Sequence, residues 1–161
     1  MAASKNVELV GASQQPLRIA GAAPVQASVE LDGHVSNKVL ESMRAEGPAA
    51  EPDRVFLNLE NVRSLSDATV LEVYVNLPEG ADPAEHPERM AGSIGLFGVS
   101  EATTSEEHGG AGLTYVLEIT HMVDALDLDT GALDVRIVPF DNVPEEAQIS
   151  IGRVSVFRQG R

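Results

Sequence analysis

The side chains most able to bind a metal are the four histidines: His34, His86, His108 and His121. No two of them are three or four residues apart, the spacing that places two ligands on one helix face. His86 lies four residues before Met90, and His121 is followed by Met122, and imidazole with thioether suits Cu(I). We favour the interpretation that Met90 is a core residue at the start of a strand, rather than half of a copper-binding pair with His86.

Two acidic segments could offer oxygen ligands. One contains Asp124, Asp127, Asp129 and Asp134 around Gly131. It resembles an oxygen-ligand calcium loop but lacks the spacing and the final Glu of an EF-hand, so we interpret it as an acidic turn. The other is Glu106-Glu107-His108, which we interpret as a solvated loop tip.

Catalysis by the chain itself is not indicated. The sequence has no cysteine, which removes thiol nucleophiles, disulfides and zinc-thiolate sites. It has no Gly-x-Ser-x-Gly elbow. The Gly-Gly-Ala-Gly run at residues 109–112 is not followed by a predicted helix, so it does not form a phosphate cradle. We therefore expect a non-catalytic chain with no cofactor or metal of its own.

Charge narrows the choice of partners. The chain has 161 residues and a net charge of -14, and nearly all of the excess negative charge falls after residue 50. Such a surface repels phosphate backbones and anionic membranes, so we expect neither nucleic acid nor membrane as a partner. No apolar run approaches the ~18 residues of a membrane span. The first residues lack the apolar core of a signal peptide, which predicts a cytoplasmic protein or a piece of a longer one and leaves the localisation unknown.

Apolar residues alternate with polar ones along most of the chain, which predicts strands. The expected strands are residues 25–31, 55–60, 71–76, 94–99, 113–119, 133–139 and 149–157, with a bulge at Gly152. Phe56 falls on the otherwise polar face of its strand. Short helical turns are expected at 36–45 and at 120–126, the latter with Thr120 as N-cap. We predict an all-β, antiparallel, jelly-roll-like β-sandwich over residues 24–161, preceded by an arm or linker at 1–23.

Several of these segments resemble the C-terminal domain of the tyrosinase and polyphenol oxidase family. The similar segments, in the family's order, are residues 70–76, 90–94, 117–126, 135–139 and 149–154. The first resembles a signature strand that reads Lys-Phe-Asp-Val-Tyr in plant enzymes, although Val-Leu-Glu replaces its first three residues here. Residues 7–12 and 56–62 resemble the tail of bacterial tyrosinase-family proteins.

The resemblance implies a jelly-roll-like domain that follows a type-3 copper catalytic domain. In that family the catalytic domain carries the six histidine ligands and oxidises phenols, while the C-terminal domain covers the copper entrance and keeps the enzyme latent. The copper domain is missing from this sequence. The implied partner is therefore a tyrosinase-like copper domain, and this chain would act as its shielding or lid domain.

Leu96 and Phe97 are the candidate contact residues for such a lid. They lie between Gly95 and Gly98, which would let them approach another surface, although both also suit a core. Two other functions fit the same pattern: a stand-alone binding or adhesion module, for example for a carbohydrate, and a self-associating module with free sheet edges. A copper-handling helper that uses Met and His is a further alternative.

Overall fold

The computed structural model describes residues 6–44, 53–65, 69–96, 98–104 and 112–160. Its strands form one antiparallel sheet in the order β6-β5-β8-β3-β1-β9-β4-β7, and β2 pairs with β9 beyond the end of β1. The strand bounds are β1 Asn6–Ser13, β2 Leu17–Ile19, β3 Val25–Leu31, β4 Arg54–Arg63, β5 Val70–Val75, β6 Met90–Gly95, β7 Leu113–Glu118, β8 Ala132–Pro139 and β9 Ile149–Gly160. This confirms the mostly β, antiparallel fold.

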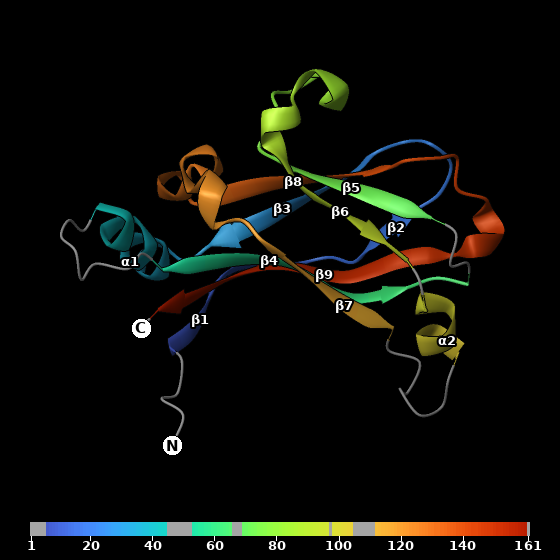
Figure 1. Ribbon diagram of the computed structural model, residues 1–161, viewed down its shortest axis with the longest axis horizontal. Helices are drawn as coiled ribbons and strands as arrows, with labels where there is room; N and C mark the ends of the chain where they lie inside the picture. The colour runs from blue at the N-terminus through green and yellow to red at the C-terminus, as the bar shows by residue number, and fades with distance from the viewer. Residues whose placement is uncertain (1–5, 45–52, 66–68, 97, 105–111, 161) are drawn as a thin grey trace.

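The helical elements lie in the connections between strands (Figure 1). They are α1 Gly33–Arg44 and α2 Val99–Thr104, together with 3-10 turns at Pro83–Glu85, Pro87–Arg89, Thr120–Leu126, Leu128–Thr130 and Glu145–Ala147. In the described part of the chain, no helix is both long and apolar enough to cross a membrane.

The sheet curls around a single core. Alternate residues of β4, such as Leu57 and Leu59, are fully buried, and so are Leu133 and Ile137 of β8 on the opposite wall. These residues belong to one continuous hydrophobic cluster. Alternation along each strand therefore fills the inside of the curl and leaves the other face to the surface.

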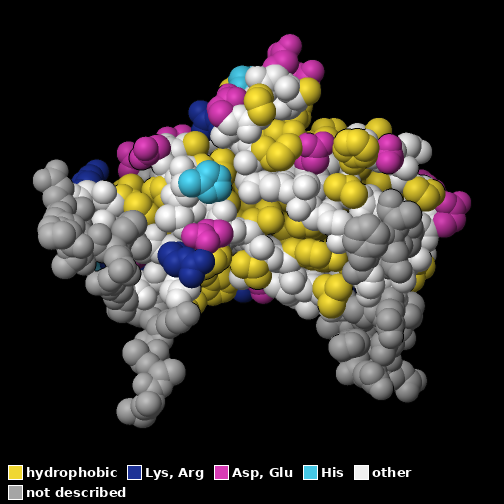
Figure 2. All heavy atoms as spheres, in the orientation of Figure 1, with side chains coloured by type: hydrophobic (Ala, Val, Ile, Leu, Met, Phe, Trp, Pro, Cys, Tyr) yellow, Lys and Arg dark blue, Asp and Glu magenta, His cyan; other side chains and the backbone are white. Residues whose placement is uncertain are grey.

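The two ends of the sheet, β6 and β7, come together and nearly close it into a barrel. Gly92 of β6 makes this possible, because a Cβ at that position would lie 2.9 Å from the side chain of Leu117 in β7. No strand pairing joins β6 to β7 within the described residues. Figure 2 shows hydrophobic side chains across the region where the two strands meet. Among the described residues, side-chain packing therefore closes the seam.

This arrangement corrects the expected sandwich of two packed sheets. Strand β8 pairs with both β3 and β5, and β1 pairs with both β3 and β9. Each of these strands is hydrogen-bonded on both sides, so the ladder runs without a break from β6 to β7. The periodicity of the strands is the same in a sandwich and in a curled sheet, which is why it could not distinguish them.

The first described residues belong to the sheet and not to an arm. Strand β1 lies between β3 and β9, and β2 extends the same edge of β9. The pairing of β1 with β9 shifts between Leu9 and Gly11, so the chain bulges there. Gly152, where a bulge was expected, stays in register with β4; the neighbouring shift lies in β4, between Leu59 and Val62.

The helices also differ from their prediction. Helix α1 begins three residues earlier than expected, because the Asp32 carboxylate accepts hydrogen bonds from the backbone N–H of His34 and Val35. Helix α2 occupies the end of the strand expected at 94–99. The Thr120 hydroxyl is not an N-cap: Ile119 holds the cap position, and Thr120 accepts a hydrogen bond from Val55 N–H.

Candidate functional site

The two residues expected to contact a partner have different outcomes. Leu96 is fully buried in the core, directly after β6, so its side chain is not available at the surface of this domain. Phe97 lies outside the described residues, and a contact role for it stays a prediction. The glycines on either side of the pair therefore do not mark an exposed apolar tip at Leu96.

The metal-binding candidates that the structure describes are not brought together, and His108 lies outside the described residues. His86 is half-buried in a surface loop, with its Nδ1 3.1 Å from Glu88 Oε1, and Met90 starts β6. His121 is exposed, whereas Met122 is buried in the core. Among the residues that the structure describes, no group of three or more His, Asp or Glu side chains could hold a metal ion.

In the acidic turn at residues 124–134, the described features are a left-handed backbone position and a side-chain hydrogen bond. Asp127 takes a left-handed conformation, with φ of 49°, between two 3-10 turns. Asp134 lies on β8, where Gln26 Nε2 donates to its Oδ2 at 2.7 Å. Partial burial raises the pKa of Asp134 above its ordinary value. Residues 106–108, the other acidic segment, lie outside the described residues.

An exposed apolar surface lies on the outside of the sheet, and we call it the outer patch. Its residues are Val7, Leu9, Phe56, Val116 and Phe157. Leu9 is directly opposite Phe157, and Phe157 is directly opposite Phe56, so these three side chains form one row across β1, β9 and β4. Val116 continues the surface on β7, opposite Asn58. Four neighbouring strands therefore contribute to one apolar face.

Three apolar side chains of the outer patch are largely exposed to solvent. Val7 and Val116 are 56% and 57% exposed, and Leu9 is 40% exposed. Phe56 and Phe157 are half-buried and line a shallow hollow of about 310 Å³ with Val7, Asn58 and Val116. Neighbouring exposed apolar side chains of this kind are typical of surfaces that contact a protein, a membrane or a ligand.

Charged residues form part of the rim of the outer patch. The Arg54 guanidinium lies 5.2 Å from the centre of the Phe56 ring and bonds Glu118, with Nη2 to Oε1 at 2.8 Å. These bonds lower the pKa of Glu118 and raise that of Arg54. The ion pair is held over the edge of the aromatic surface, an arrangement of apolar centre and polar rim that is typical of protein interfaces.

The sequence carries a partial signal for this surface. Phe56 falls on the otherwise polar face of its strand, and Phe157 breaks the alternation of β9 in the same way. Leu9 and Val7 could not be assigned, because the segment that contains them was expected to be an arm. Only the register of β1 against β9 brings Leu9 beside Phe157.

The fold resembles that of one part of known polyphenol oxidases. A solved structure of latent aurone synthase, a polyphenol oxidase, matches 91% of this chain with a TM-score of 0.53 at 13% identity; the match covers 26% of that protein. The structure of latent apple tyrosinase matches 88% of this chain with a TM-score of 0.50 at 18% identity, over 27% of its own length. The chain therefore has the fold of a domain found in these proteins.

The chain belongs to the family described as Domain of unknown function (DUF7868), which it matches over residues 6–159. It is also 28% identical, over 108 residues, to the tyrosinase HcTyr1 of Hahella sp. (strain CCB-MM4). That match covers 64% of this chain and 23% of the tyrosinase, so the chain spans about a quarter of such proteins. The resemblance is confirmed: this chain is homologous to the C-terminal region of tyrosinases and polyphenol oxidases.

Proposed function

We propose that this chain is a non-catalytic shielding domain, which covers the copper site of a tyrosinase-like catalytic domain and makes that domain latent. The copper and the oxidation chemistry belong to the catalytic domain. The outer patch carries the proposal, because a sheet face with three apolar side chains at least 40% exposed is costly to leave in water. Homology to the C-terminal region of tyrosinases supports a catalytic domain as the partner that covers it.

The contact does not need high intrinsic affinity. When two domains belong to one chain, their effective concentration reaches the millimolar range, so a weak interface stays closed. Interfaces between domains bury roughly 600–1,500 Å² and contain many polar groups. The outer patch with its Arg54–Glu118 rim has this mixed character.

The test is a chimera of the Hahella tyrosinase in which this chain replaces the matching C-terminal segment. We expect the chimera to oxidise a bulky catechol several-fold more slowly than the tyrosinase truncated before that segment, and a small catechol to be less affected. Replacing Phe56→Ser and Phe157→Ser together should restore the rate, since both side chains would contact the catalytic domain.

Phe140→Ser is the matched control, because Phe140 is a 67% exposed aromatic residue outside the outer patch. Circular dichroism of each variant checks that the domain is folded. A chimera as active as the truncated enzyme on both substrates would refute the shielding role.

Self-association is the alternative that the same surface supports, since two copies could bury their outer patches against each other. Sedimentation equilibrium of the isolated chain distinguishes the two functions. We expect a monomer at micromolar concentration. A stable dimer that Phe56→Ser dissociates and Phe140→Ser does not would replace the shielding proposal by a self-associating module.

A further inference from the structure

Two arginines share one cleft and have no carboxylate partner among the residues that the structure describes. Most of the described basic side chains, namely Lys38, Arg54, Arg136, Arg153 and Arg158, lie within 4.0 Å of a carboxylate oxygen. By contrast, Arg18 and Arg63 form neither an ion pair nor a side-chain hydrogen bond with any residue that the structure describes. Arg44 and Arg89 also lack a carboxylate partner among the described residues, so what distinguishes Arg18 and Arg63 is that both line one cleft.

Strand register places the two arginines on one face of the sheet. Arg18 of β2 is directly opposite Ser150 of β9, and Arg63 of β4 is directly opposite the same Ser150 from the other side. Residues directly opposite each other on neighbouring strands have their side chains on the same face. Strands lie about 4.8 Å apart, so the two arginine backbones are separated by about 10 Å, with a serine hydroxyl between them.

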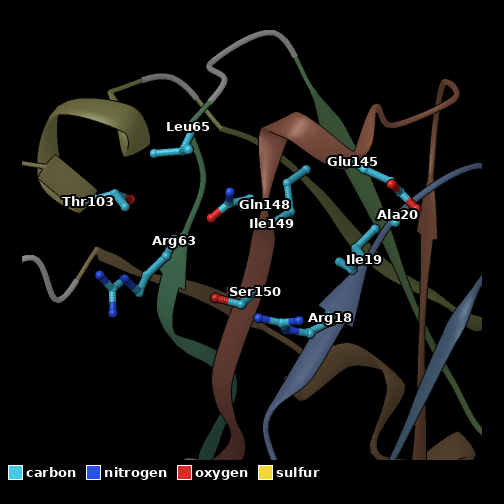
Figure 3. Close-up of a pocket in the computed structure, with 10 residues that line it drawn as sticks. All are labelled: Arg18, Ile19, Ala20, Arg63, Leu65, Thr103, Glu145, Gln148, Ile149 and Ser150. Carbon is cyan, nitrogen blue, oxygen red and sulfur yellow. The ribbon is translucent and has the colours of Figure 1, made fainter.

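These residues line an open cleft of about 630 Å³. Figure 3 shows Arg18 extending over β9 toward Ser150, whereas Arg63 extends from β4 to the side away from β9. Both arginines are exposed and long, so Arg63 can turn toward Ser150 when a ligand is present. Among the described lining residues the carboxylate is Glu145, which lies on the other side of β9 from Arg63 (Figure 3).

The walls of the cleft include apolar surface. Leu65, which is 47% exposed, lies on the side of β4, and Ile19 and Ile149 line the floor. Thr103 also lines the cleft, but its hydroxyl already accepts a hydrogen bond from Ser64 N–H and donates to the Val99 carbonyl. Among the described lining residues, the donors left for a ligand are the two guanidinium groups, the Ser150 hydroxyl and the Gln148 side-chain amide.

We propose that this cleft binds a small organic anion, whose carboxylate is held by Arg18, Arg63 and Ser150 and whose apolar body lies against Leu65. Guanidinium groups bind carboxylates through paired, charge-assisted hydrogen bonds. Once Arg63 turns toward Ser150, the two guanidinium groups place like charges on either side of that serine, and an anion between them offsets their repulsion. The proposal concerns a different surface from the outer patch and does not depend on the shielding function.

Isothermal titration calorimetry of the whole chain tests the site with three probes at constant ionic strength. Benzoate supplies a carboxylate with an apolar body, inorganic phosphate an oxyanion without one, and benzyl alcohol an apolar body without charge. We expect benzoate to bind more tightly than phosphate, and benzyl alcohol not to bind. Arg18→Gln and Arg63→Gln should each weaken benzoate binding about tenfold, the loss of one charge-assisted contact.

Arg44→Gln is the matched control, because Arg44 is an exposed arginine at the end of α1 that also has no carboxylate partner among the described residues. Binding of benzoate by this variant should equal that of the wild type. Equal loss in all three variants would show general charge screening and overturn the site. Phosphate binding as tight as benzoate binding would overturn the claim that the ligand is organic. Unchanged benzoate binding by Arg18→Gln and Arg63→Gln would overturn the site itself.

Discussion

Strands β4 and β9 run side by side for most of their length, yet the arginines at their two ends differ in whether they form ion pairs. At the end near Arg54 and Arg158, each guanidinium is bonded to a carboxylate. At the end near Arg63, the guanidinium groups of Arg63 and Arg18 have no such partner among the described residues. We call these the paired end and the free end.

The buried network of the paired end belongs to the fold. Arg158 is only 8% exposed; its Nε donates to Asp53 Oδ2 at 2.6 Å, and its Nη1 bonds Glu8. Lys38 of α1 bonds Glu8 as well, at 2.9 Å, so the network joins β1, β9, the start of β4 and the helix. The paired end therefore contributes to the fold, whereas the free end leaves two guanidinium groups available for the proposed anion.

Removing Arg158 should have the largest effect on stability. Arg158→Met leaves the carboxylate of Asp53 buried without its partner, which costs about 3 kcal/mol in the free energy of unfolding. Urea unfolding measures the loss, and Arg44→Met is the exposed control. The double variant Arg158→Met with Asp53→Leu should recover much of the loss, because no uncompensated charge remains. A loss below that of the control would mean that the network contributes nothing to the fold.

Acid should weaken the paired end through Glu8. The hydrogen bond from Lys38, with the charges of Lys38 and Arg158, lowers the pKa of Glu8 below its ordinary value of 4.5. A carboxyl group with a lowered folded-state pKa stabilises the fold above its unfolded pKa, and this contribution is lost as pH falls through the folded pKa. Lys38→Met should therefore destabilise the protein at pH 7, and the difference from wild type should shrink below pH 4.5. A difference that is constant from pH 7 to pH 3 would contradict this.

The exposed pair beside the outer patch should contribute less. Arg54→Gln removes the bonds to Glu118, so the pKa of Glu118 should rise toward 4.5. The change in stability should be small, because exposed ion pairs are screened by water and salt. Titration of the side-chain carboxyl signal of Glu118 by NMR measures the pKa directly. An unchanged pKa would show that the pair is not formed in solution.

The free end should show the smallest effect, with the opposite sign. Arg63→Gln removes a positive charge that has no carboxylate partner in the described chain, so stability without ligand should stay the same or rise slightly. Thermal unfolding without added anion measures this against Arg54→Gln. A clear loss of stability from Arg63→Gln would assign Arg63 a structural role and remove the contrast between the two ends.

Much of the fold was predictable from local pattern. The alternation at residues 25–31 and 133–139 predicted β3 and β8 closely, since a half-buried strand shows the same period wherever it lies in a sheet. The strand expected at 94–99 was placed four residues too late, since β6 is Met90–Gly95. Leu96 and Val99 are core residues that follow β6, and Gly98, with φ of 79°, turns the chain between them.

The candidate site was less predictable. Leu96 was chosen for its flanking glycines, yet it is a core residue, because a glycine permits close approach in either direction. The outer patch was visible in part at Phe56. The sequence did not indicate the free end, since Arg18, Arg63 and Ser150 are far apart in the chain and become neighbours only through strand pairing.

Local periodicity, composition and ordered motifs are enough to predict a mostly β, acidic protein that resembles a tyrosinase C-terminal region. The single curled sheet, the place of β1 inside it and the identity of neighbouring outward side chains depend on strand pairing between distant segments. Register between strands is set by long-range packing around a common core, and a one-residue shift would place every outward side chain on the other face.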